Sequence, residues 1–255
     1  MSGLFSLAGK VALVVGAGAG GLGERIATAL AEQGAVLAIA DREVRSDDLE
    51  ATSRRCGGAS VHFCDVTDEA QVEALLSAVV ERHGRLDILV NAAGVMLRKA
   101  YDETSLEEFQ RVIGVNLTGT WLLNRAAGRR MSTQGSGKIV NLSTVYAERV
   151  GPVPESAYYA SKAGIANVTR ALAAELGPHG ITVNCVAPGV FYPTQMTAAL
   201  AESPDQLAWF SQRTMLGRLG DPARDIAGPV ILLASDASAY MTGQVVYVDG
   251  GWSAW

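Results

Sequence analysis

The sequence predicts an α/β protein with one doubly wound parallel sheet of about seven strands and helices on both faces. Three observations support this fold class. The predicted strands are short and continuously apolar, as expected for strands that are buried on both faces. Segments with the apolar spacing of helices lie between them. The 255 residues are 49% hydrophobic and 18% charged, which excludes a disordered chain and suits a single domain over residues 1–255.

The order of the elements follows from the apolar runs and their boundaries. Strands are expected over residues 10–15, 35–40, 60–63, 86–90, 138–142, 181–186 and 244–248. Helices are expected over 22–33, from a cap at Thr67 to Gly84, from Ser105 through Ala127, over 156–177 and over 222–234. Ser105 and Glu108 have the spacing of a capping box. Residues 190–220 form a long connection without strands, and such connections are usually functional.

Charge and hydropathy exclude several classes of protein. The net charge of −5 and the pI near 5.3 argue against a nucleic-acid surface. The longest uncharged stretch, residues 180–201, contains Asn184 and Pro188 and does not suit a membrane span. No signal-peptide pattern begins the chain, so a cytoplasmic protein is expected. The three cysteines lack C-x-x-C spacing, which predicts neither structural disulfides nor a metal site.

A glycine-rich turn follows the first predicted strand and precedes the first helix. Its residues are Gly16, Gly18, Gly20, Gly21, Leu22 and Gly23. Glycine lets the backbone turn sharply and approach a pyrophosphate, whose charge the N-terminus of the next helix attracts. This context predicts a Rossmann-type dinucleotide site, and a packing turn of small residues is the alternative.

Acidic residues end the next two predicted strands. Asp41 lies 18 residues beyond Gly23, where a carboxylate accepts hydrogen bonds from the adenosine ribose and repels a 2′-phosphate. This predicts NAD (NADH) as the cofactor, with NADP less favoured, although the neighbouring Arg42 would suit the phosphate. Asp65, before Val66, either reaches the adenine amino group or closes an Asx turn.

A tyrosine, a lysine and a pair of hydroxyls form the candidate catalytic group. Tyr158 and Lys162 are four residues apart on a predicted helix and share a face. A nearby ammonium stabilises a phenolate, so Lys162 is expected to lower the pKa of Tyr158 towards the working range. Ser143 and Thr144 end the fifth predicted strand, and strand alternation turns only one of them to the substrate. Thr144 is preferred, with Ser143 as the alternative.

Together these motifs resemble the short-chain dehydrogenase/reductase family over essentially the whole chain. The matching segments are the glycine turn, Asp41, Asp65-Val66, Asn91-Ala-Ala-Gly94, Val115-Asn116, Asn141-Leu-Ser-Thr144, Tyr158-x-x-x-Lys162, Asn184, Pro188-Gly189 and Val248-Asp-Gly-Gly251. Three departures stand out. The glycine turn is one residue too long, at Gly18 or Gly20, and Val15 replaces the usual threonine. Thr144 lies one residue further from Tyr158 than usual, and the segment from Pro188 to Thr194 is also one residue longer.

The resemblance implies an oxidoreductase that interconverts a secondary alcohol and a ketone by hydride transfer with NAD. Tyr158 would be the general acid/base, and Lys162 would also hold the nicotinamide ribose. Thr144 or Ser143 would bind the substrate oxygen, and Asn116 would anchor a water in the proton relay. The further cofactor contacts that it implies are Asn91, Ala92, Ala93, Gly94, Val115, Pro188, Gly189, Val190 and Thr194.

The substrate and the partners are less constrained. A sugar acid or polyol, a 3-oxoacyl thioester and a hydrophobic ketone all stay open, and a non-catalytic NAD-binding sensor or scaffold is the alternative function. The apolar side chains expected to line a pocket in the substrate loop, residues 190–220, are Phe191, Tyr192, Met196, Leu200, Trp209, Phe210, Met215 and Leu216. Arg98, Arg149 and Arg213 are candidates for binding an acid. The resemblance also implies a homotetramer, with helices over 105–130 and 156–177 at one interface and Trp252 and Trp255 at another.

Overall fold

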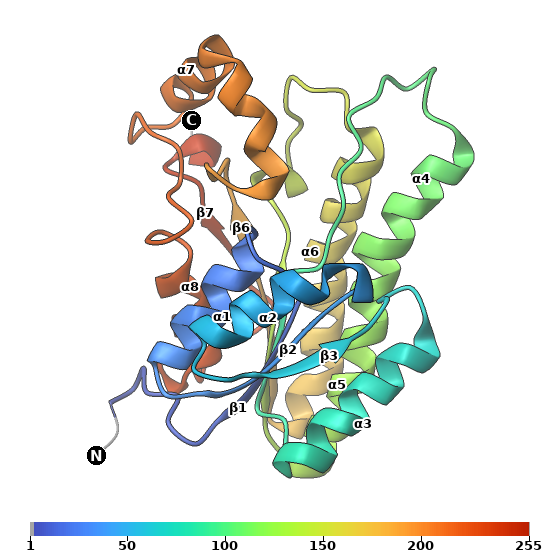
Figure 1. Ribbon diagram of the computed structural model, residues 1–255, viewed down its shortest axis with the longest axis vertical. Coiled ribbons are helices and arrows are strands. Elements are labelled where there is room, and N and C mark those ends of the chain that lie inside the picture. Colours follow the sequence, from blue (N-terminus) through green and yellow to red (C-terminus); the bar gives the residue numbers. More distant parts are fainter. Residues whose placement is uncertain (1–2, 255) are drawn as a thin grey trace.

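The strands form one parallel sheet in the computed structural model, which describes residues 3–254. Within that range the sheet has seven strands in the spatial order β3-β2-β1-β4-β5-β6-β7. They are β1 (Val11–Val15), β2 (Val36–Asp41), β3 (Ser60–Phe63), β4 (Ile88–Asn91), β5 (Gly137–Leu142), β6 (Ile181–Pro188) and β7 (Val245–Val248). The chain moves outward from β1 in one direction and then returns to β4 on its other side (Figure 1). The predicted doubly wound fold is confirmed.

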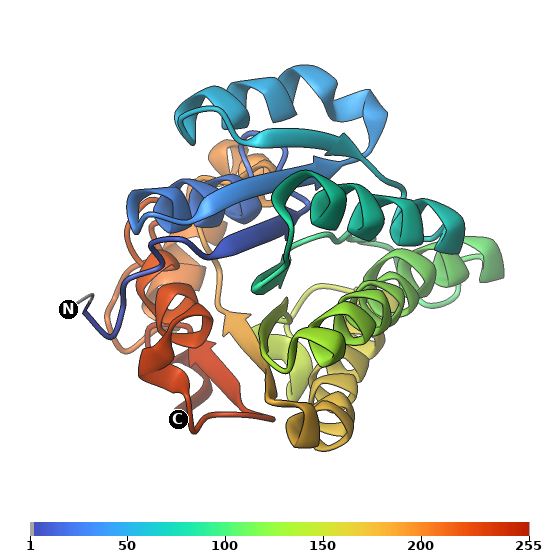
Figure 2. The same ribbon diagram turned by 90° about the horizontal axis from the view of Figure 1, so that it is seen from below.

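Helices cover both faces of this sheet (Figure 2). Leu13 and Val15 of β1 pack in one cluster with α3 (Glu69–His83), α5 (Gly119–Gln134) and α6 (Ser156–Leu176). Ala12 and Val14 pack on the opposite face with α1 (Leu22–Glu32) and α8 (Ala227–Ala234). Successive strand residues therefore enter two different cores, which explains why the strands are continuously apolar.

The apolar pattern did not predict the helix that follows β2. α2 (Ser46–Arg55) lies between β2 and β3, and only Leu49 and Thr52 are buried among its residues. Two buried positions do not make an apolar stripe. The two aspartates in its first turn and the two arginines in its last turn complement the helix dipole. This charge pattern was the signal in the sequence from which α2 could have been predicted.

Two predicted helices differ in detail from the structure. The capping box of Ser105 and Glu108 starts α4 (Leu106–Ile113), but a π-helical turn over Gly114–Thr118 separates α4 from α5. Thr67 was the wrong cap for α3. Asp68 takes that position because its carboxylate accepts hydrogen bonds from the first-turn N–H groups of α3.

The long connection after β6 is more ordered than predicted. It contains a 3-10 segment, Gln195–Glu202, and the helix α7 (Pro204–Gln212). Phe191 and Gly220 form an isolated parallel bridge that closes its base. The helix predicted over 222–234 is shorter, since turns held by Asp225 precede α8. None of the helices in residues 3–254 combines the length and the apolar character that a membrane crossing needs.

Candidate functional site

Loops at the carboxyl ends of β1 to β6 line one cavity of about 910 Å³. This is the edge of a doubly wound sheet where ligands bind. Every candidate catalytic or cofactor-binding residue from the sequence lines the cavity except Gly20, Asn91 and Asn116. The cavity also includes polar residues that the sequence reasoning did not select, among them Arg45, Tyr146, Glu155, Tyr159 and Gln195.

The glycine turn serves both packing and an open crevice. A Cβ at Gly16 would stand 2.5 Å from the backbone nitrogen of Ala93, and one at Gly23 would overlap the Gly16 carbonyl oxygen. Gly16 and Gly23 are therefore required by close packing, as the alternative of a packing turn of small residues predicted. A Cβ at Gly21 would instead meet no neighbouring atom closer than 3.6 Å. Gly21 precedes α1, whose N-terminus has no side-chain cap, and Leu22 beside it lines the cavity. The bare N-terminus and the open space fit a pyrophosphate.

Gly20 takes the left-handed backbone conformation that glycine favours and links the turn to the loop after β6. Its φ is +85°, and its N–H donates to Glu24 Oε2 over 2.7 Å. Its carbonyl accepts from the Gln195 N–H over 2.8 Å. The buried Glu24 also pairs with Arg55, which compensates its charge.

Charges of both signs surround the end of β2. Asp41 accepts hydrogen bonds from the N–H of Gly18 at 3.0 Å and of Arg42 at 2.8 Å. Its carboxylate is therefore fixed beside the glycine turn. Arg45 spans the same region, donating to Ala19 O over 2.9 Å and to Gln195 Oε1 over 2.5 Å. A carboxylate and two guanidinium groups thus line this end of the cavity.

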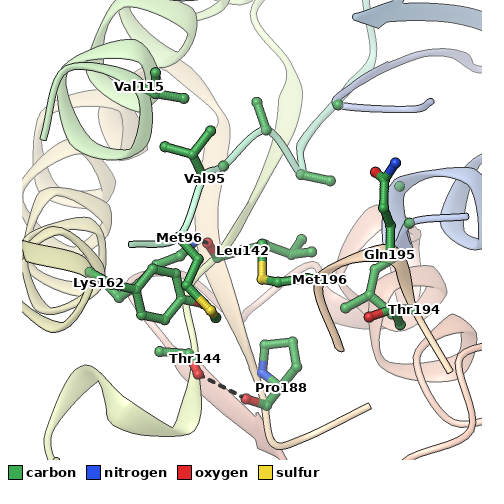
Figure 3. A pocket seen from close by; sticks show the side chains of 18 of the residues that line it. Val95, Met96, Val115, Leu142, Thr144, Lys162, Pro188, Thr194, Gln195 and Met196 are labelled. Carbon is green, nitrogen blue, oxygen red and sulfur yellow. Dashed lines mark hydrogen bonds between the residues drawn. The ribbon is translucent and has the colours of Figure 1, made fainter. Parts of the chain in front are cut away.

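Asp65 forms the predicted Asx turn. Its Oδ1 accepts from the Thr67 N–H at 2.9 Å and from the Thr67 hydroxyl at 2.7 Å. Asp65 and Val66 still line the cavity, as does Val115 of the π-helical turn, which Figure 3 shows near Val95.

Asn91 and Asn116 stand behind the cavity wall instead of lining it. Asn91 donates to Thr120 Oγ1 and accepts from the Ala93 N–H, which shapes the turn after β4. Asn116 is fully buried, and its side chain bonds both backbone groups of Val95 and the hydroxyl of Ser161. Its main-chain carbonyl also accepts a hydrogen bond, from the Thr120 hydroxyl over 2.5 Å. Both side chains position neighbouring wall residues.

Tyr158 and Lys162 face the cavity from α6. The ammonium of Lys162 lies 5.7 Å from the centre of the Tyr158 ring and donates to Leu142 O over 2.8 Å. Burial lowers the pKa of Lys162 to about 8. Burial and the Glu155 charge raise the pKa of Tyr158, while a hydrogen bond with Thr144 lowers it. The expected lowering by Lys162 is not seen, because its ammonium is turned to the backbone of β5.

The two neighbouring hydroxyls have different partners. Ser143 donates to Lys162 O over 2.7 Å, so it ties β5 to α6. Thr144 makes a longer contact of 3.3 Å with Pro188 O (Figure 3) and hydrogen-bonds the phenol of Tyr158. They point in opposite directions, as strand alternation requires. Thr144 therefore lies closer to the proposed chemistry.

Polar and apolar side chains both line the far end of the cavity. The polar ones include Arg98, Tyr146 and Glu155. Of the apolar residues selected from the substrate loop, four line the cavity: Phe191, Met196, Leu200 and Phe210. Tyr192, Trp209, Met215 and Leu216 do not line it, and neither do Arg149 and Arg213.

The predicted interface role of Trp252 is wrong. Its side chain is only 5% exposed and stacks on Phe210 inside the chain, with ring centroids 5.9 Å apart. Trp252 thus supports the wall of the cavity through Phe210. Trp255 lies outside the described residues.

Comparison with known proteins agrees with this geometry. Residues 16–253 match the sequence profile of a family described as enoyl-(acyl carrier protein) reductase, which groups ~250-residue short-chain enzymes. The chain belongs to the short-chain dehydrogenase/reductase family. Its relatives are named dehydrogenases and reductases of alcohols and ketones, so the protein is an alcohol dehydrogenase or ketone reductase.

Three members of the short-chain dehydrogenase/reductase family illustrate the similarity. The cis-4-hydroxycyclohexanecarboxylate dehydrogenase of Sinomonas cyclohexanicum is 40% identical, covering 98% of this chain and 98% of that protein. The galactitol 2-dehydrogenase (L-tagatose-forming) of Cereibacter sphaeroides is 38% identical, covering 99% and 98%. A solved gluconate 5-dehydrogenase from Burkholderia cenocepacia J2315, in complex with NADP and tartrate, is 34% identical, with a TM-score of 0.91 and coverage of 99% and 98%.

Proposed function

We propose that this enzyme interconverts a secondary alcohol and a ketone with NAD, using Tyr158 as the general acid/base. One observation carries the proposal. Tyr158, Thr144 and Lys162 line one end of the cavity whose other end is lined by the glycine turn and Asp41. A dinucleotide that extends through this cavity would bring its reactive end to the tyrosine.

Each residue has a part that its position supports. The N-terminus of α1 attracts the pyrophosphate, and Asp41 accepts hydrogen bonds from the adenosine ribose. NAD supplies the hydride acceptor when it is bound. In the oxidation direction Tyr158 removes the hydroxyl proton of the substrate, and the Thr144 hydroxyl donates to the substrate oxygen as charge builds on it.

Lys162 and Gly94 prepare the place of the nicotinamide ribose. A Cβ at Gly94 would stand 3.5 Å from Lys162 Nζ, so glycine at this position keeps the space beside the ammonium open. With a pKa of about 8, Lys162 is mostly protonated at neutral pH. Its ammonium can then donate to ribose oxygens and stabilise the phenolate that forms during turnover.

The preference for NAD rests on Asp41. Its fixed carboxylate would repel a 2′-phosphate at the same place. Arg42 and Arg45 oppose this preference, and a related structure is in complex with NADP. Titration with NADH and NADPH measures the preference directly. Tighter binding of NADPH would overturn it.

The substrate class and the setting of the enzyme are also proposed. Relatives named for galactitol and 5-keto-D-gluconate favour a sugar acid or polyol over a thioester or a hydrophobic ketone. We infer a homotetramer in the cytoplasm. The half-exposed Trp121 on α5, with Arg125 stacked on its ring at 4.5 Å, offers a surface for one of its interfaces. Light scattering tests the assembly.

A coenzyme-linked screen over alcohols and ketones of graded size and charge tests the function. We expect turnover with NAD of at least one polyhydroxy substrate, and none by Tyr158→Phe. Coenzyme binding without turnover of any alcohol or ketone would instead indicate a sensor or scaffold.

A further inference from the structure

An ion pair with a buried carboxylate and an exposed guanidinium lies near the catalytic tyrosine and has no part in the proposed proton transfer. Arg98 follows β4, and its Nε donates to Glu155 Oε1 over 2.8 Å. Glu155 immediately precedes α6, three residues before Tyr158. The Glu155 side chain is 4% exposed and that of Arg98 is 39% exposed, and both line the cavity. The pair therefore forms part of the substrate end of the site.

Glu155 has the geometry of a fixed hydrogen-bond acceptor. The N-terminus of α6 and the guanidinium of Arg98 both stabilise its ionised form. Burial raises its pKa, and the hydrogen bond to Arg98 opposes that effect. A carboxylate with one oxygen held by arginine keeps further lone pairs for donors in the cavity.

The pair itself carries no net charge, and its carboxylate is the partner that acts more strongly on the neighbouring phenols. Glu155 raises the pKa of Tyr158 and of Tyr159, and Arg98 lowers them by a smaller amount. Glu155 also raises the pKa of Tyr146. A carboxylate ligand beside Glu155 would be repelled by its charge, whereas a hydroxyl could donate to it.

Two cations that line the cavity lie near Tyr158, and both have partners. The Lys162 ammonium is 5.7 Å from the centre of the Tyr158 ring and is bonded to Leu142 O, and Arg98 Nε is bonded to Glu155. Arg42 and Arg45 follow β2 at the adenosine end, and Arg111 lies on α4. An acidic substrate near Tyr158 would therefore have to compete with Glu155 for Arg98.

Apolar side chains line the same end of the cavity. Met96 and Met196 come from the loops after β4 and β6 and point into the same space (Figure 3). Phe191, Leu200 and Phe210 also line it. A molecule that carries both hydroxyls and carbon–hydrogen groups would find partners for each there.

We propose that the substrate is a neutral vicinal diol or sugar alcohol, and that Glu155 accepts a hydrogen bond from the hydroxyl next to the reacting carbon. This rests on the proposed function. The secondary alcohol loses a hydride to NAD and its hydroxyl proton to Tyr158, which leaves a ketone and NADH. Glu155 takes no part in making or breaking bonds and is a positioning residue.

The wild-type enzyme provides the first test. Initial rates with NAD are measured for sugar alcohols of four to six carbons and for the aldonic acids of matching configuration. The proposal expects the best sugar alcohol to exceed its matched acid at least ~10-fold in kcat/KM, which corresponds to one charge contact. An acid that exceeds its matched sugar alcohol by that factor would overturn the substrate class while leaving the dehydrogenase function intact.

Glu155→Gln provides the second test, with cyclohexanol as a matched substrate that lacks the neighbouring hydroxyl. Loss of the Glu155 charge beside Tyr158 affects both substrates alike, so we expect kcat/KM for the sugar alcohol to fall ~10- to 100-fold further than that for cyclohexanol, mainly through KM. Equal losses on both substrates would overturn the positioning role. If this variant does not fold, Glu155→Asp keeps the charge, and its loss must be confined to the sugar alcohol.

Two outcomes separate this proposal from the one on which it rests. Oxidation of cyclohexanol alone, without any sugar alcohol, contradicts the diol proposal but supports the dehydrogenase. Absence of coenzyme reduction with every alcohol contradicts both.

Discussion

Replacing Thr144 by valine removes one hydroxyl and keeps the shape of the side chain. In the structure this hydroxyl hydrogen-bonds the phenol of Tyr158, and its other contact, with Pro188 O, is 3.3 Å long. The valine loses both contacts, so we expect unfolding to become easier by about 1 to 2 kcal/mol. Loss of one donor to a developing oxyanion costs roughly 3 to 4 kcal/mol, or about 100- to 1000-fold in kcat.

Ser143→Ala is the matched control from the adjacent position. Its hydroxyl donates to Lys162 O over 2.7 Å in a buried site, so this variant should lose about 1 to 3 kcal/mol of stability. Its kcat should stay within about threefold of the wild type, because the donor faces α6 and not the substrate. The assays are initial rates of NAD reduction and urea unfolding. A larger fall in kcat for Ser143→Ala than for Thr144→Val would refute the assignment.

Three further substitutions test other parts of the site. Gly23→Ala should lower the free energy of unfolding in urea by about 3 kcal/mol and weaken coenzyme binding, because the added Cβ overlaps the Gly16 carbonyl. Gly177→Ala is the control: its added Cβ meets no atom within 4 Å, so it should be neutral or slightly stabilising. Similar losses of stability in both variants would contradict the packing role of Gly23. Asp41→Asn should raise the affinity for NADPH relative to that for NADH by about tenfold, because the charge that repels a 2′-phosphate is lost. An unchanged ratio of the two dissociation constants would show that Asp41 does not contact the adenosine ribose. Lys162→Met should stabilise the protein at pH 7 by up to roughly 3 kcal/mol, since folding lowers the lysine pKa to about 8. Between pH 8 and about 10.4 the unfolded wild type binds more protons than the folded wild type, so the stability of the wild type rises with pH. The difference in unfolding free energy between Lys162→Met and the wild type should therefore shrink over this range. A difference that grows would contradict a buried Lys162 ammonium.

The sheet and most of the cavity could be predicted because both follow from local patterns. Buried parallel strands leave continuous apolar runs, and their carboxyl ends meet at one edge. Residues that follow those runs, such as Asp41 and Thr144, therefore line the same cavity. α2 escaped prediction because only Leu49 and Thr52 of that helix enter the core.

Contacts between distant segments could not be predicted from spacing. The bond between Arg98 and Glu155 joins residues 57 positions apart, and the bond between Arg45 and Gln195 joins residues 150 apart. Neither pair has a local sequence signature. Trp252 likewise suggested a partner surface, whereas tertiary packing places it on Phe210 inside the same chain. These long-range contacts decide which charges remain available to a ligand.

The measurement that tests the account most directly is the turnover of Tyr158→Phe together with its affinity for NADH. This change removes one oxygen from a ring that is otherwise fixed by packing in the cavity wall. We predict a loss of at least about 1000-fold in kcat, with the dissociation constant of NADH unchanged within about threefold. Turnover near the wild-type rate with intact NADH binding would contradict the assignment of Tyr158 as the acid/base.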